Sequence, residues 1–303
     1  MIAMNKRLLS GLPLAAGSLL AAWYLPAWIL LPVFLSISIL AQLEFYGLLD
    51  RAGIPSFRVI GILFGVLLIA TTFWGLLNYA ADAPLLGGLI GEFFVFLLIF
   101  VVVIRMFPQK DNPAPLATIA CTIFGVLYVA FLFNFFLKIT YSWQCSGFSQ
   151  PLDQTGRSMV IFLLAVVKMT DTGALLVGKL AGRHKMIPRI SPGKTWEGTI
   201  GGVVIGVLSG FLCVYLMHTS DHSGIWHMGV IRFGLVDALA IGFILACVAV
   251  LGDLVESLLK RAAGVKDSGN LFPGIGGMMD LVDSVLLSAP VLYYYLVFVC
   301  SRV

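Results

Sequence analysis

A short polar stripe directly follows an apolar stretch in the C-terminal half of the chain. Its members have the spacing i, i+3, i+4 and i+7, which places them on one face of a helix: Asp253, Glu256, Ser257 and Lys260. Two further carboxylates, Asp280 and Asp283, are three residues apart where the last apolar stretch begins. Mg²⁺ binds carboxylates together with substrate phosphate oxygens, so the series indicates metal-assisted phosphate chemistry. Interfacial ion pairs would explain two or three of these residues but not the whole series.

Basic residues accompany these carboxylates. Arg261 and Lys266 follow the stripe, and a glycine-rich turn at 273–277 precedes the second carboxylate pair. Lysine and arginine can neutralise the charge that develops during phosphoryl transfer, which agrees with the same chemistry.

The segment 179–198 is a second candidate for phosphate binding, with the sequence KLAGRHKMIPRISPGKTWEG. Its glycines and prolines predict turns in which backbone N–H groups, Ser191, Lys194 and Thr195 surround phosphate oxygens. The alternative is a basic loop that only contacts anionic headgroups. The likeness to a P-loop is superficial, because the spacing GxxxxGK[ST] is absent.

Ionisable residues also occur inside apolar stretches. Lys168 and Asp171 share a helical face, and such residues at membrane depth cost at least about 2.5 kcal/mol, which favours a functional role. A neutralised pair that holds two helices together is the alternative. Glu44 and Glu92 also lie in or near apolar stretches, and for Glu92 a structural role is favoured.

The composition limits the class of protein. Of 303 residues, 60% are hydrophobic and only 11% are charged, with a mean hydropathy of +1.01. A chain with so little charge cannot cover a water-soluble surface, which excludes a soluble enzyme, a disordered protein and a secreted disulfide scaffold. The prediction is an all-α, polytopic membrane bundle.

We expect about nine transmembrane helices, each long enough to cross the hydrocarbon core, and we do not interpret the first as a cleaved signal peptide. They are predicted at 8–24, 27–44, 59–77, 84–104, 116–137, 158–178, 199–217, 233–252 and 283–300. Most lysines and arginines fall on one side of this arrangement, which predicts a cytoplasmic N-terminus. Residues 1–150 are then a transmembrane scaffold of about five helices. Residues 151–303 form a catalytic region with cytoplasmic loops at 179–198 and 253–282.

The segment 257–283, SLLKRAAGVKDSGNLFPGIGGMMDLVD, resembles the long motif of the phosphatidate cytidylyltransferases, also called CDP-diacylglycerol synthases. Asp171, the Gly-Lys and Gly-Arg pairs at 178–179 and 182–183, and ISPGKTWEG at 190–198 resemble another block of that family. The likeness covers about 168–284. Ile275 stands where the family usually has His, Leu281 where it has Arg, and Gly193 where Lys is common, which we interpret as subfamily variation.

The resemblance implies transfer of the cytidylyl group of CTP to phosphatidic acid, giving CDP-diacylglycerol and pyrophosphate for phospholipid biosynthesis. Our hypothesis assigns Mg²⁺, with room for a second cation, to Asp253 and Asp280, with Glu256 and Asp283 as further metal ligands. The catalytic residues would be Asp253, Asp280, Lys260, Lys266 and Asp267. The substrate-binding residues would be Ser191, Lys194, Thr195, Glu197, Ser257, Arg261, Lys179, Arg183 and Asp171. Among these, Ser191 and Glu197 would order the 179–198 loop, and Asp171 would line a polar funnel with Lys168.

Three alternatives stay open. A CTP-dependent polyprenol or phytol kinase has broadly similar C-terminal motifs and would transfer the γ-phosphoryl group instead. A cation or proton transporter would use Lys168, Asp171 and Asp253 as a relay, although the concentration of charge in two loops fits that poorly. A purely structural scaffold is the third alternative, and the carboxylate series argues against it.

The same interpretation predicts the location and partners of the protein. We expect an integral protein of the bacterial inner membrane with its active site on the cytoplasmic face. CTP, phosphatidic acid and the lipid bilayer are the expected partners, nucleic acid is not, and a homodimer is left open.

Overall fold

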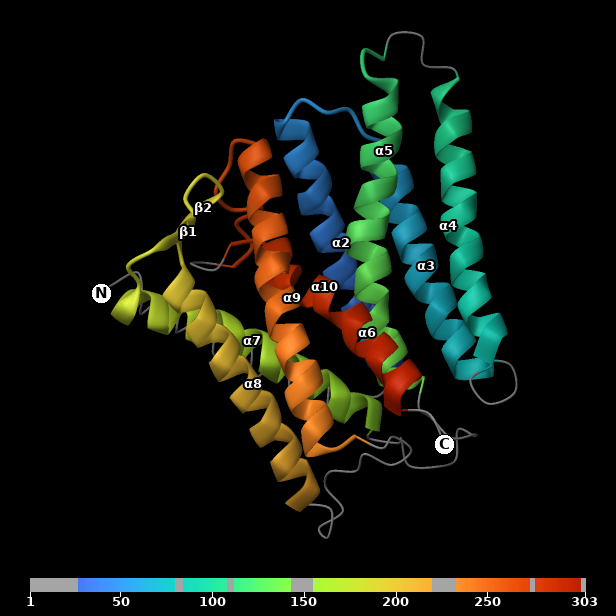
Figure 1. Ribbon diagram of the computed structural model, residues 1–303. Coiled ribbons are helices and arrows are strands. Elements are labelled where there is room, and N and C mark those ends of the chain that lie inside the picture. The colour runs from blue at the N-terminus through green and yellow to red at the C-terminus, as the bar shows by residue number, and fades with distance from the viewer. Residues whose placement is uncertain are drawn as a thin grey trace. The chain divides into compact units, whose positions relative to one another are not determined.

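A computed structural model of the chain describes residues 27–79, 84–107, 112–142, 155–219, 233–272 and 276–300. It is helical almost throughout, as predicted, and Figure 1 shows the elements. In chain order these are α2 (Ala27–Arg51), α3 (Arg58–Tyr79), α4 (Pro84–Met106), α5 (Pro115–Gly125), the π-helix η1 (Val126–Phe131), α6 (Leu132–Tyr141), α7 (Thr155–Ala181), β1 (Lys185–Ile187), β2 (Ser191–Thr195), α8 (Trp196–Thr219), α9 (Leu235–Ala262), α10 (Met278–Tyr295) and the π-helix η3 (Leu296–Cys300).

The protein is a polytopic helical membrane protein. Among the described residues, 7 helices are long and apolar enough to span a bilayer, and each overlaps a predicted span. They are Ile29–Arg51, Arg58–Leu76, Pro115–Tyr141, Thr155–Ala181, Trp196–Met217, Leu235–Ala262 and Met278–Cys300. The predicted span 84–104 corresponds to α4, of which Phe93–Met106 qualifies as a shorter apolar helix. The span predicted at 8–24 lies outside the described residues, so the count of nine and the cytoplasmic N-terminus stay predictions.

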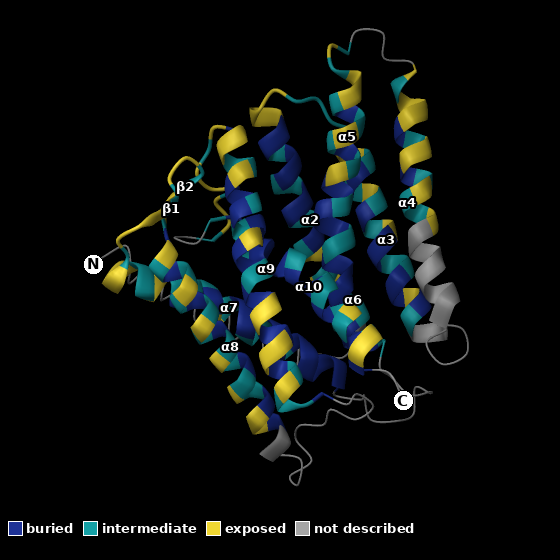
Figure 2. Cartoon of the chain, in the orientation of Figure 1, coloured by how far each residue is buried: buried dark blue, intermediate teal, exposed yellow. Residues whose placement is uncertain are grey.

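One face of α8 carries exposed apolar side chains, and Figure 2 shows exposed residues at intervals along this helix. Its large side chains recur every three or four residues: Trp196, Ile200, Val204, Leu208, Leu212, Tyr215 and Leu216. Soluble proteins rarely expose an apolar stripe of this size to water, whereas the lipid chains of a membrane solvate it.

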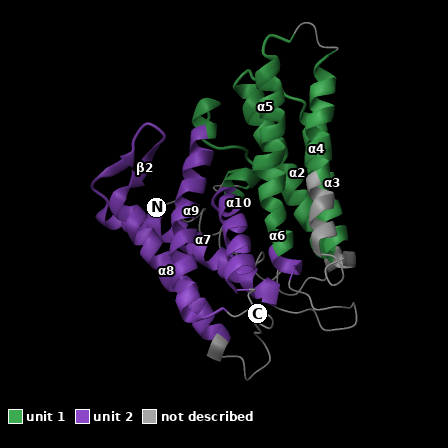
Figure 3. Cartoon of the chain, turned by 45° about the vertical axis from the view of Figure 1, so that its right-hand side comes forward, with its two compact units in different colours: residues 1–138, 145–147, 259–282 green, residues 139–144, 148–258, 283–303 purple. Residues whose placement is uncertain are grey.

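The chain packs into two compact units, coloured in Figure 3. Unit 1 comprises residues 1–138, 145–147 and 259–282, and unit 2 comprises 139–144, 148–258 and 283–303. Helices α9 and α10 each contribute to both units. The predicted functional division at residue 150 is a different kind of boundary and stays a prediction.

Buried polar side chains tie the helices of unit 1 together. The Tyr46 hydroxyl of α2 donates to the Thr122 carbonyl of α5 at 2.9 Å. The Asn134 side chain of α6 donates to the Thr72 hydroxyl of α3, also at 2.9 Å. Hydrogen bonds of this kind are favoured in an apolar interior, since an unpaired polar group there costs more than it does in water.

In unit 2, α7 and α8 run side by side in close contact (Figure 1). Gly202 makes this approach possible, because a Cβ there would lie 2.6 Å from the Thr170 carbonyl oxygen and 2.8 Å from the Ala174 methyl group. Small residues at helix contacts are the usual way for membrane helices to pack closely.

The loop between α7 and α8 contains a small antiparallel hairpin, which the all-helical prediction did not include. In it, Lys185 lies opposite Thr195 and Ile187 opposite Ser191. Pro188 and Pro192 lack the N–H that a helix would need here, so a turn with two short strands forms instead. The hairpin leads directly into α8, whose first turn is capped by the Thr195 hydroxyl accepting from the Gly198 N–H at 3.2 Å.

Replacing Gly202 with alanine should destabilise the protein by about 1–3 kcal/mol, since the methyl group would force α7 and α8 apart. Thermal unfolding of the purified protein in detergent measures this effect. Gly47→Ala is the matched control, because a Cβ at that helical glycine meets nothing within 4 Å. Equal melting temperatures for the two variants would contradict the packing described for α7 and α8.

Candidate active site

Three carboxylates come together in unit 2. Asp253 and Glu256 of α9 and Asp283 of α10 each place one oxygen within 4.8 Å of the others. Glu256 and Asp283 are buried, at 1% and 7% exposure, and Asp253 is half-buried. Carboxylate oxygens that converge in this way could hold a metal ion.

Close contact between the two helices brings these carboxylates together. A Cβ on Gly252 would lie 2.9 Å from both the Asp283 carbonyl oxygen and the Ser284 Cα, so only glycine allows α9 and α10 to cross here. Asp253 follows this crossing point directly on one helix, and Asp283 lies at it on the other. The sequence places Asp253 and Glu256 on one helix and Asp283 on another, and the crossing point makes them one cluster.

Polar side chains of unit 2 surround the cluster. Lys194 of the hairpin binds Asp253 at 2.8 Å, and its side chain is only 20% exposed. The Ser284 hydroxyl donates to Asp283 at 3.1 Å and is 3.4 Å from Asp171 of α7. Lys168 lies 4.0 Å from Asp171, so the predicted pair on α7 is present. Ser257 donates to Asp253 at 3.4 Å.

The hairpin that carries Lys194 is held by Glu197 in the first turn of α8. The Glu197 carboxylate accepts the backbone N–H of Arg183 at 3.1 Å and that of His184 at 3.2 Å. It also contacts the His184 ring nitrogen Nδ1 at 2.5 Å. These contacts link the start of the hairpin to its end, which fixes the position of Lys194 between them.

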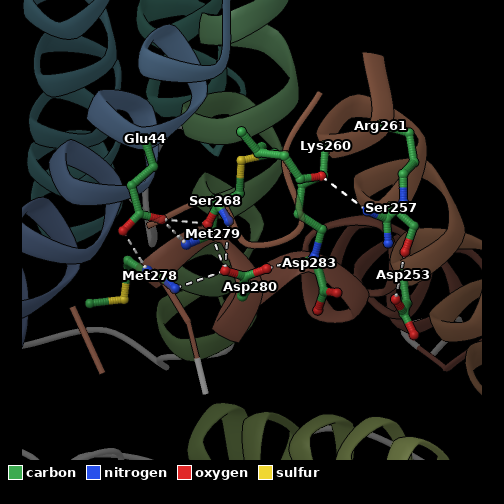
Figure 4. A network of polar contacts seen from close by, with 12 residues as sticks. Glu44, Asp253, Ser257, Lys260, Arg261, Ser268, Met278, Met279, Asp280 and Asp283 are labelled. Carbon is green, nitrogen blue, oxygen red and sulfur yellow. Dashed lines mark hydrogen bonds and ion pairs between the residues drawn. The ribbon is translucent and has the colours of Figure 1, made fainter. Parts of the chain in front are cut away.

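A second carboxylate network lies in unit 1 and is centred on Asp280 (Figure 4). Lys260 binds one Asp280 oxygen at 2.6 Å. The other oxygen accepts the Gly277 N–H at 2.7 Å and the Ser268 N–H at 3.0 Å. Asp280 therefore both pairs with a lysine and organises the turn that precedes its own helix.

Glu44 of α2 supports the same turn (Figure 4). Its carboxylate accepts the backbone N–H groups of Met278 and Met279, both at 2.8 Å, which caps the N-terminus of α10. It also accepts the Ser268 hydroxyl at 2.8 Å. From the sequence, Glu44 is only a carboxylate in or near an apolar stretch, with no predicted role. Its position as an isolated carboxylate in an apolar stretch was the one signal available.

Glycines let the turn approach Glu44. A Cβ on Gly277 would collide with the Glu44 carboxylate, and Gly276 has a φ of 121°, which L-residues with side chains rarely adopt. The Gly-Gly pair of the motif is thus required by backbone conformation and by close packing.

The remaining predicted residues differ in their surroundings. Arg261 donates to the Val265 carbonyl at 3.2 Å and is exposed, as are Lys266 and Asp267. Lys179 and Arg183 are exposed, Ser191 begins β2, and Thr195 is buried. Ile275 lies outside the described residues. The prediction that Asp253 and Asp280 share one cation stays a prediction.

These features define a class of protein: a membrane-embedded helical protein with buried carboxylates that could hold a metal ion, beside a lysine-bearing hairpin. Residues 5–299 match the cytidylyltransferase family, and the chain belongs to that family. This confirms the resemblance found in the sequence motifs.

Individual relatives agree with this assignment. A phosphatidate cytidylyltransferase of Synechocystis sp. is 31% identical over 307 residues, which is 95% of this chain and 93% of the relative. The phosphatidate cytidylyltransferase of Bacillus subtilis is 36% identical over 172 residues, 57% of this chain and 56% of that one. That of Haemophilus influenzae is 34% identical over 144 residues, 48% and 47% of the two chains.

Replacing Glu44 with glutamine should loosen the turn before α10, because an amide NH₂ would face some of the donors that the carboxylate now accepts. Hydrogen exchange at the Met278 and Met279 amides should then become at least about tenfold faster. Asp50→Asn, an exposed carboxylate near the end of the same helix, should leave these amides unchanged. Protection that is the same in Glu44→Gln and in the parent protein would exclude this role for Glu44.

Proposed function

We propose that the protein transfers the cytidylyl group of CTP to phosphatidic acid, releasing CDP-diacylglycerol and pyrophosphate. Membership of the family along nearly the whole chain supports the reaction, and so does the name of the relative that matches 95% of this chain. The observation that carries the proposal is the carboxylate cluster Asp253, Glu256 and Asp283 beside the partly buried Lys194.

In this reaction a phosphate oxygen of phosphatidic acid attacks the α-phosphorus of CTP. The bond between that phosphorus and the oxygen bridging to the β-phosphate breaks, and pyrophosphate leaves with the bond's electron pair. Such a transfer needs positioning and charge neutralisation more than covalent participation by the protein. A helix crossing that fixes several carboxylates, with the hairpin lysine beside them, would meet this requirement.

Asp253, Glu256 and Asp283 are the residues that would hold Mg²⁺, since their oxygens converge and hard cations prefer carboxylates. The cation would supply charge neutralisation at the phosphate oxygens. Lys194 lies beside the cluster, where it pairs with Asp253. Once released from Asp253, the lysine would add a positive charge for the triphosphate. The Ser284 hydroxyl orients Asp283, and Glu197 orders the hairpin.

Asp280 is the second metal ligand proposed from the sequence. Its contacts with Lys260, Ser268 and Gly277 support a positioning role as well, because both of its oxygens already accept hydrogen bonds. The two roles differ in their dependence on the metal. Replacing a ligand raises the metal concentration needed for half-maximal activity, whereas replacing a positioning residue lowers the maximal rate alone.

We further propose that the site faces the cytoplasm of a bacterium. CTP is a cytoplasmic substrate, and most lysines and arginines fall on the side of the chain that carries the hairpin and the turn before α10.

Asp283→Asn should lower kcat by about 100-fold or more, by the usual effect of removing a group that stabilises transition-state charge. It should also raise the Mg²⁺ concentration needed for half-maximal activity. The fold should be kept, because the asparagine oxygen can still accept the Ser284 N–H. Product formation from CTP labelled in the α-phosphate measures both quantities. Asp280→Asn, tested in parallel, assigns that residue to one of the two roles above.

Asp237→Asn is the matched control, since Asp237 lies near the other end of α9. The asparagine oxygen can still accept the Gly234 N–H, and its NH₂ can donate to the Tyr295 hydroxyl. Incorporation of label from the γ-phosphate instead of the α-phosphate would replace the proposal with the lipid-kinase alternative. Unaltered turnover and metal dependence in Asp283→Asn would exclude the carboxylate cluster as the metal site.

A further inference from the structure

Unit 1 contains a hollow beside α2 to which no role has yet been given. It has a volume of about 490 Å³, within the range of small-ligand sites. Its walls come from α2, from the start of α3 and from the turn after α9. The lining residues are Leu40, Leu43, Glu44, Gly47, Arg51, Arg58, Ser268, Gly269, Asn270 and Leu271.

The wall that α2 contributes is graded from apolar to charged. The α2 residues in the lining are at 40, 43, 44, 47 and 51, which is one face of a helix. The face begins with Leu40 and Leu43, passes the side-chain-free Gly47 and ends at Arg51. This stretch is about 16 Å long at 1.5 Å per residue. A surface that changes from apolar to cationic over such a distance matches a phospholipid, with its acyl chains at one end and its phosphate at the other.

The charged end of the hollow has two guanidinium groups. Arg51 is exposed in the last turn of α2 and has no ion-pair partner among the described residues. Arg58 opens α3, and among the described residues its contact with a carboxylate is a long one of 4.0 Å to the exposed Asp50. Arginine binds phosphate oxygens through paired N–H groups, so both side chains suit a phosphate ligand.

Glu44 repels an anion in this hollow less strongly than an unpaired carboxylate would, because hydrogen-bond donors engage its charge. Its carboxylate accepts three hydrogen bonds, from the Ser268 hydroxyl and from the Met278 and Met279 N–H groups at the positive end of α10. These contacts bind the carboxylate to the opposite wall and thereby hold that wall in place. Ser268 connects the hollow to Asp280, whose oxygen it also contacts at 2.8 Å.

We propose that this hollow binds phosphatidic acid, with the phosphate between Arg51 and Arg58 and an acyl chain along Leu40 and Leu43. A phosphomonoester carries about −1.5 to −2 charges near neutral pH, which two guanidinium groups match better than they match the single charge of a diester. The proposal rests on the proposed function for the identity of the lipid. It gives the N-terminal helices a role in substrate binding beyond that of a scaffold.

Substituting Arg51 or Arg58 with glutamine should raise the KM for phosphatidic acid by about tenfold or more and leave the KM for CTP unchanged. Mixed micelles with a varied mole fraction of phosphatidic acid allow this measurement. Arg105→Gln is the matched control: Arg105 is an exposed arginine in the last turn of α4, does not line the hollow and packs over the Phe57 ring. A KM for phosphatidic acid that both substitutions leave unchanged would overturn the proposal.

A larger side chain at position 47 tests whether the lipid occupies the hollow, without changing any charge. A Cβ at this position meets nothing within 4 Å, so α2 accepts a side chain there. Gly47→Leu should fill the hollow and raise the KM for phosphatidic acid, with a smaller rise for Gly47→Ala. Normal lipid kinetics in a folded Gly47→Leu variant would show that the lipid binds elsewhere.

Direct lipid binding separates this proposal from the proposed function. Phosphatidic acid, phosphatidylglycerol and phosphatidylcholine are titrated against the parent protein and Arg51→Gln in detergent, and bound lipid is read by native mass spectrometry. Preference for phosphatidic acid that is lost in Arg51→Gln supports the site, even if the parent protein makes no CDP-diacylglycerol and the proposed function fails. Equal binding of phosphatidylglycerol would mean that the arginines only attract anionic lipid, and would overturn the proposal.

Discussion

The main physical constraint on this structure is the free-energy cost of placing carboxylates in helices within an apolar environment. A buried carboxylate needs hydrogen-bond donors or a positive charge, because no water is present to solvate it. Each unit meets this need differently. In unit 1, Glu44 and Asp280 are satisfied by backbone N–H groups, a serine and Lys260. In unit 2, Asp253, Glu256 and Asp283 lie close together with Lys194 near one of them. The first arrangement is a network of hydrogen bonds and an ion pair, whereas the second brings three carboxylates close enough together that they could hold a metal ion.

Glycine has the same physical role in both networks, which is to let one backbone approach a functional group. Gly252 allows α9 to cross α10 where Asp253 and Asp283 meet, and Gly277 allows the turn before α10 to reach Glu44. These positions carry no chemistry of their own. They determine which carboxylates become neighbours, and this explains why a motif rich in glycine accompanies the acidic residues. A methyl group at Gly252 would meet the backbone of α10, and one at Gly277 would meet the Glu44 carboxylate.

The sequence was sufficient for features that depend on local spacing and on hydropathy. The stripe from Asp253 to Lys260 and the pair Asp280 and Asp283 are correctly placed on helices, because a 3.6-residue period is visible in the sequence. The contact of Glu44 with Ser268 was not predictable, since the two residues are 224 positions apart and nothing local relates them. The hairpin at 185–195 was missed for a different reason. Its strands are too short to show alternation, and proline and glycine indicate a turn without specifying the strands that flank it.

Hydropathy also explains why the N-terminal half was interpreted as scaffold. The mean hydropathy of a span indicates that α2 is apolar. It contains no information about which face of the helix each residue occupies. On the face that contains residues 40, 43, 44, 47 and 51, α2 changes from leucine to arginine along its length. A lipid substrate imposes this kind of gradient, because its chains must stay in hydrocarbon while its phosphate reaches the level of charged side chains and water. An enzyme whose one substrate is a membrane lipid and whose other is a nucleotide therefore needs two chemically different surfaces. In our two proposals, the carboxylates and the lysine serve the nucleotide and its cation, and the graded helix face with arginine at its end serves the lipid.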